Sequence, residues 1–196
     1  GADDNASGVA GLVELARVLA PIPRARSIRL ISFGAEEQLS VGSAEYVRRH
    51  RRSLAKSALL MFNLDSYSSY MGWSTLTVNG PEPLAGQVES RFFAAGVYPR
   101  LSSEVVPYSD HFPFVAAGVP SIWLGRDNCT SGRFFHHRPD DDQSRVSVDV
   151  MSRQLETISR YMAELANIED LPFEKAVPEA QARKAGDFWE GLFGGW

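Results

Sequence analysis

The stretch Ser27-Ile-Arg-Leu-Ile-Ser-Phe33, followed by Gly34-Ala35 and the pair Glu36-Glu37, is the most informative part of this chain. Its apolar residues are typical of a β-strand that is largely buried. A buried strand that ends in two like charges needs something to neutralise them, because removing a carboxylate from water is unfavourable by several kcal/mol. A metal cation would do so, with one glutamate binding it and its neighbour moving a proton.

Length and composition exclude several classes of protein. The chain has 196 residues, 44% of them hydrophobic and 22% charged, as expected for one globular domain with a real core. Its net charge of −4 argues against nucleic acid as a partner. No apolar run approaches the ~18 residues needed to cross a bilayer, so no membrane span is predicted. Cys129 is the only cysteine, which excludes an internal disulfide and a thiolate metal site.

Predicted helices and strands alternate along the chain. The apolar periodicity and the Gly and Pro punctuation predict helices over 9–20, 42–52, 84–95, 110–117 and 148–166, and strands over 27–33, 58–64, 73–78 and 120–124. Such alternation is typical of an α/β protein. We expect a three-layer sandwich, in which a central, mostly parallel sheet is covered by helices on both faces.

The last part of the chain has a different character. Residues 1–168 form the predicted domain, and residues 169–196 form a tail that carries Phe188, Trp189, Phe193 and Trp196. Four large apolar side chains near a terminus need a surface to cover them. The tail either packs back on its own domain or serves as a self-association arm, and the second alternative would give a homo-oligomer.

Acidic side chains occur where the predicted fold would bring them together. Asp4 precedes the first helix, Glu36 and Glu37 follow one strand, and Asp65 ends the next. In open α/β sheets, ligand sites form beyond the carboxyl ends of the strands. His137 lies in a loop before the last helix. Carboxylates with imidazole, and without thiolates, suit a catalytic Zn²⁺ or a similar divalent ion.

Each of these residues also has an ordinary structural explanation. Asp4 or Asn5 could cap the first helix, Asp65 could close a turn, and His136-His137 could lie on a surface loop. These explanations do not account for acidic groups at successive strand ends, which would repel one another without a cation.

Five motifs resemble those of the zinc exopeptidases that include bacterial leucyl aminopeptidases, aminopeptidase Y and glutamate carboxypeptidase II. They occur in the family's order between Gly1 and about Val150, and together they are highly specific. They are Gly1-Ala-Asp-Asp-Asn-Ala-Ser-Gly8, Phe33-Gly-Ala-Glu-Glu-Gln-Leu-Ser-Val-Gly-Ser43, Asn63-Leu-Asp65, Ser109-Asp-His111 and His137-Arg-Pro-Asp-Asp141. The Gly-Leu that usually follows the Glu-Glu pair is replaced here.

The resemblance implies roles for individual residues. Asp4 would bridge two zinc ions, and Glu37 and His137 would complete one site. Asp65 would belong to the other site, and Glu36 would be the general base. His137 is preferred to His136 because only His137 has the family spacing to Asp141, which would orient it from behind. The implied reaction is removal of N-terminal residues from peptide substrates, and the implied location is secreted or periplasmic.

One motif of the family is absent. The family carries a His-x-Asp element upstream of the bridging aspartate, and this chain begins after that point, so we expect it to be N-terminally truncated. Three alternatives remain open for the centre: part of a two-zinc enzyme, a site that works with one zinc, or an inactive, receptor-like domain. His111 and His136 are possible substitutes for the missing histidine. A single-zinc glutaminyl cyclase on the same fold is the alternative chemistry.

Overall fold

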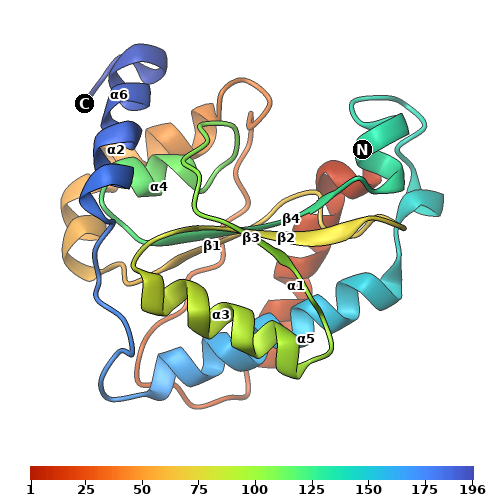
Figure 1. Cartoon of the computed structure of the whole chain (residues 1–196), viewed down its shortest axis with the longest axis horizontal. Helices are drawn as coiled ribbons and strands as arrows, with labels where there is room; N and C mark the ends of the chain where they lie inside the picture. Colours follow the sequence, from red (N-terminus) through yellow and green to blue (C-terminus); the bar gives the residue numbers. More distant parts are fainter.

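The computed structural model describes residues 1–196, which form a four-stranded sheet between two layers of helices (Figure 1). The strands are β1 (Met61–Leu64), β2 (Trp73–Asn79), β3 (Arg100–Ser102) and β4 (Ser121–Asp127), and their order in the sheet is β1-β4-β2-β3. β1 runs parallel to β4 and β2 parallel to β3, whereas β2 and β4 are antiparallel. The predicted α/β sandwich with a mostly parallel sheet is confirmed.

The helices divide between the two faces of this sheet. α1 (Ser7–Leu19), α3 (Glu82–Ala94) and α5 (Val148–Asn167) cover one face in Figure 1, and α2 (Val41–Ser57), α4 (Phe112–Ala116) and α6 (Glu179–Phe193) lie on the other. All five predicted helices form, with ends that differ from the prediction by at most five residues. β3 and α6 were not predicted. No helix combines the length and the apolar character that crossing a bilayer requires.

The main core fills the space between the sheet and the α1, α3 and α5 layer. Its fully buried side chains come from β2 and β4 on one side and from the helices on the other, as expected when each element presents one apolar face. They include Leu76, Leu124, Val88, Phe92 and Ile158. This packing holds the start of α1 against the end of β1, which is where the predicted site lies.

The predicted strand over 27–33 is wrong as a strand. The segment has neither helical nor strand structure and forms no sheet hydrogen bonds, and the sheet ends at β1. Ile28 and Leu30 pack on the main core, so the apolar pattern does report burial. A mainly apolar cavity of about 740 Å³ is lined by this segment and by residues 57–62, at the edge of the sheet. A segment becomes a β-strand only when a neighbouring strand lies within hydrogen-bonding distance, and residues 27–33 have no such neighbour.

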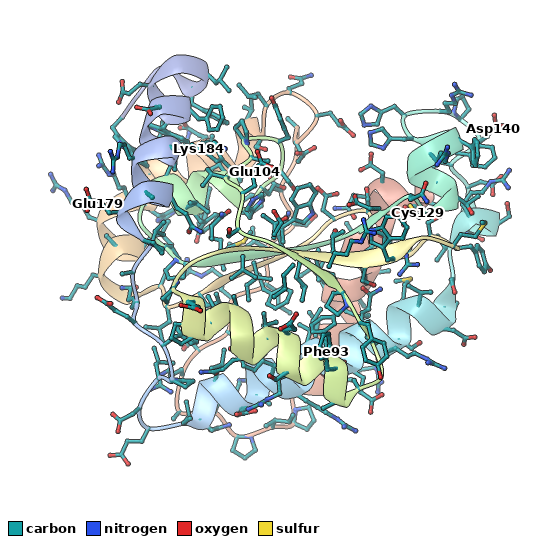
Figure 2. All side chains as sticks on the ribbon, viewed as in Figure 1. Phe93, Glu104, Cys129, Asp140, Glu179 and Lys184 are labelled. Atoms are coloured by element: carbon teal, nitrogen blue, oxygen red, sulfur yellow. The ribbon has the colours of Figure 1, made fainter.

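The C-terminal tail lies on its own domain in this structure. Trp189 and Ala185 of α6 are fully buried in a second core cluster with Phe112 of α4. Lys184 pairs with Glu104 at 3.5 Å, and Figure 2 shows both side chains where α6 borders the neighbouring loop. Self-association through the tail stays a prediction.

Candidate metal centre

The turn that carries Asp4 is fixed to the end of β1. Asn5 caps α1, because its Oδ1 accepts a hydrogen bond from the Gly8 amide at 2.9 Å. The Asn5 amide nitrogen donates to the Leu64 carbonyl at 3.0 Å, which ties this turn to the last residue of β1. A Cβ at Gly8 would lie 2.5 Å from the same carbonyl, so the close approach of α1 to β1 requires glycine. The sequence order Asp4-Asn5 therefore places Asp4 near Asp65.

The four predicted carboxylates Asp4, Glu36, Glu37 and Asp65 line one pocket of about 410 Å³. Asp4 comes from the turn before α1, Glu36 and Glu37 from the turn before α2, and Asp65 from the end of β1. Asp110, just before α4, lines the pocket as well. The structure thus gathers carboxylates from four separate segments at the carboxyl end of β1. The sequence predicts three of these segments, and Asp110 is an addition.

Three of the predicted ligands meet at the edge of this pocket. His137 Nε2 lies 3.1 Å from Asp4 Oδ2 and 2.8 Å from Glu37 Oε1. The Asp4 side chain is 11% exposed, whereas those of Glu37 and His137 are about half exposed, at 55% and 53%. The site is therefore open to solvent on the side of the imidazole and closed on the side of the sheet.

Crowding of negative charge changes the acidity of the inner carboxylates. Burial, followed by the charges of Asp65, Asp110, Glu37 and Asp4, raises the pKa of Glu36 to about 8. Burial is also the main cause that raises the pKa of Asp65 to about 6, although a hydrogen bond from Ser109 opposes it. A bound cation would lower both pKa values, because it favours the ionised form of each carboxylate.

Two serine hydroxyls hold the inner acids in place. Ser109 Oγ donates to Asp65 Oδ2 at 2.5 Å and accepts from the Asn63 amide at 2.7 Å. Ser43 Oγ donates to Asp110 Oδ1 at 2.5 Å. The sequence pattern did not predict these supporting roles. The one local signal is that Asn63 and Asp65, two residues apart in an extended segment, point to the same face.

Asp141 does not orient His137, contrary to the expectation. Its two carboxylate oxygens accept hydrogen bonds from the amides of Asp3 and Asp4, both at 3.1 Å, and from Ser131 Oγ at 2.7 Å. Burial acts to raise the pKa of Asp141, but these contacts together lower it below its usual value. The reason for the difference is geometric: Asp141 contacts the backbone amides of Asp3 and Asp4, whereas His137 contacts the Asp4 side chain. Asp141 is therefore a positioning residue for Asp4.

Replacing Asp141 by asparagine is expected to weaken zinc binding by about 10–100-fold, the usual effect of losing a partner that orients a metal ligand. The amides of Asp3 and Asp4 donate to different oxygens of Asp141, and asparagine has an NH₂ group, which cannot accept, in place of one of them. The measurement is zinc affinity by competition with a chromogenic chelator. Asp140→Asn is the matched control, because Asp140 lies exposed on the rim of the same loop (Figure 2). Equal affinity in the Asp141 variant and the wild type would contradict the assigned role.

Comparison with known proteins gives consistent matches. The family described as Peptidase family M28 matches residues 1–162. Aminopeptidase YwaD of Bacillus subtilis is 32% identical over 199 residues, covering 98% of this chain and 43% of that protein. The structure of BSAP, a zinc aminopeptidase from Bacillus subtilis, aligns with a TM-score of 0.73 at 27% identity, covering 90% of this chain and 46% of BSAP.

A third match concerns the fold alone. The glutaminyl cyclase of an Acidobacteriales bacterium aligns with a TM-score of 0.65 at 18% identity, covering 85% of this chain and 62% of the cyclase. This chain spans less than half the length of YwaD and of BSAP. The comparisons therefore cover nearly all of this chain but only part of each aminopeptidase.

Proposed function

This chain belongs to peptidase family M28, and from that membership we propose that it takes part in zinc-dependent removal of N-terminal residues from peptides. One observation carries the proposal: Asp4 and Glu37 both approach His137 Nε2, beside a pocket that Glu36 and Asp65 also line. The aminopeptidase names of YwaD and BSAP support the same activity.

The residues at this point fit a zinc ion. A single ring nitrogen carries one proton or one lone pair, so His137 Nε2 cannot bond well to both neighbouring carboxylates. Around a tetrahedral zinc with bonds of about 2.0–2.1 Å, ligand atoms are roughly 3.3 Å apart. The contacts of 2.8 and 3.1 Å at His137 are close to that separation. Asp4, Glu37 and His137 would hold one ion, and Asp65 would share a second ion with Asp4.

The chemistry divides between the ion and the protein. Zinc held by Asp4, Glu37 and His137 would supply a Lewis acid, which is the chemistry that polarises a peptide carbonyl and lowers the pKa of a water molecule. Glu36 is the proton carrier, because its half-buried carboxylate lines the pocket without belonging to the three side chains that meet at His137 Nε2. It accepts a proton from the attacking water and returns that proton to the amine nitrogen that leaves.

Metal removal tests the proposal directly. Purified protein is expected to hydrolyse an aminoacyl chromogenic substrate, to lose this activity after dialysis against a chelator, and to regain it when zinc is added back. Zinc per chain, measured by elemental analysis, should fall and rise with the activity. Ring closure of a peptide with N-terminal glutamine, in place of hydrolysis, would replace the peptidase proposal by a cyclase. Zinc uptake without turnover of either substrate would overturn both activities.

A further inference from the structure

We infer that His136 is a further zinc ligand of this site. This inference rests on the proposed function, because it requires that zinc binds at Asp4. The Nδ1 atom of His136 lies 3.2 Å from Asp4 Oδ2, and His137 Nε2 lies 3.1 Å from the same oxygen. Candidate ligand atoms of Asp4, His136 and His137 all lie within 4.8 Å of one another. The sequence analysis preferred His137 to His136 for this ion and kept His136 only as a possible substitute for the missing upstream histidine.

Loop geometry explains how two successive side chains reach one carboxylate. His137 has a φ of +58°, in the left-handed region that residues other than glycine rarely adopt. In extended backbone, successive side chains point to opposite sides. The left-handed turn at His137 instead brings both imidazoles to the same side of the loop. Their rings stack with centroids 3.7 Å apart and planes at 24°.

The position of His136 is difficult to explain as that of an ordinary loop residue. Its side chain is 49% exposed, so water could satisfy both ring nitrogens without any contact to the protein. It nevertheless turns inward to an aspartate that already has a second imidazole beside it. Two nitrogens and an oxygen at these separations make up the set of two histidines and one carboxylate that is common among catalytic zinc sites.

This ligand set has a specific consequence for the chain. Asp4, Glu37 and His137 are the three protein ligands assigned to this ion above, the number that catalytic zinc sites usually have. His136 would be a fourth protein ligand of the same ion. A water would then take a fifth position. Two imidazoles per zinc, in place of one, is the measurable signature of this arrangement.

The test counts imidazoles and measures affinity without relying on activity. X-ray absorption of the wild type loaded with one zinc per chain is expected to show two imidazoles for that ion, and of His136→Ala or His136→Gln loaded in the same way only one. Chelator competition should show that each His136 variant binds zinc more weakly by at least about 10-fold, since removing even a supporting partner has an effect of that order. His50→Ala, a substitution of an exposed histidine on α2, should leave both readouts unchanged.

Each alternative outcome is decisive. His136 variants that keep the wild-type affinity and imidazole count would overturn the inference while leaving the proposed function intact, as would a single imidazole in the wild type. A wild-type protein that takes up no zinc would overturn the proposed function and this inference together. Circular dichroism of the metal-free proteins distinguishes misfolding from loss of a zinc ligand. The His136→Gln variant preserves much of the side-chain volume and replaces the His136→Ala variant if the latter does not fold.

Discussion

Glu36→Gln is expected to lower kcat for peptide hydrolysis by about 10²–10⁴-fold, which corresponds to a barrier increase of about 3–5 kcal/mol. Glutamine has nearly the same shape as glutamate and can line the same pocket, but its amide cannot accept the proton of the attacking water. Zinc content should stay at the wild-type value, because Asp4, Glu37 and His137 are unchanged. Steady-state kinetics together with elemental analysis of the same sample provide the measurement.

Glu45→Gln is the control for this prediction. Glu45 is exposed on α2 and forms an ion pair only with Arg49, one turn along the same helix. An exposed pair of this kind contributes little to stability, so the control should fold and turn over substrate like the wild type. If Glu36→Gln turned over substrate as fast as Glu45→Gln, proton transfer would have to be assigned to another group.

Asp4→Asn is expected to weaken zinc binding strongly, because the Asp4 carboxylate is the oxygen ligand that both imidazoles approach. The loss of affinity should exceed the roughly 10–100-fold that follows loss of a residue that only orients a ligand. A neutral amide provides neither the negative charge nor the strong oxygen donor of a carboxylate. The effect can be read as stability. At zinc concentrations about 100 times its Kd, the wild type should gain about 2.7 kcal/mol in the free energy of unfolding. The variant should gain far less at the same zinc concentration.

Denaturant titrations with and without zinc make this measurement. Asp149→Asn is a suitable control, because Asp149 is exposed in the first turn of α5 and is not among the side chains that line the site. The metal-free Asp4 variant should unfold near the wild-type midpoint, since the Asp4 amide can still donate to Asp141. Equal zinc stabilisation of wild type and Asp4→Asn would show that the ion binds elsewhere.

Local patterns predicted most of the secondary structure and the gathering of the acids. The apolar periodicity of α1 and α5 and the capping residue Asn5 depend on neighbours within a few positions, and these elements form where they were predicted. Glu36, Glu37 and Asp65 follow predicted strands and were expected in one pocket for that reason. They do line one pocket, although residues 27–33 do not join the sheet. Resemblance to a family then assigned individual roles to these residues, which the sequence pattern alone had not assigned.

The errors concern contacts that no local pattern describes. Residues 27–33 have the composition of a strand, but a strand also needs a partner, and nothing in the segment specifies one. Asp141 was expected to act on His137, four residues away, and instead supports Asp4, 137 residues away. Spacing along the sequence does not reveal that two residues so far apart in the chain are in contact.

The sequence by itself determined the α/β fold class, the positions of most helices, and the set of carboxylates and imidazole from which a zinc site could be built. Only the tertiary structure decided that His136 reaches Asp4 beside His137, that Asp141 holds the Asp4 turn, and that Ser109 supports Asp65. The physical reason is that helix periodicity and capping are set by neighbouring residues. The geometry of a site instead depends on how distant segments pack, and one left-handed residue in a loop is enough to redirect a side chain.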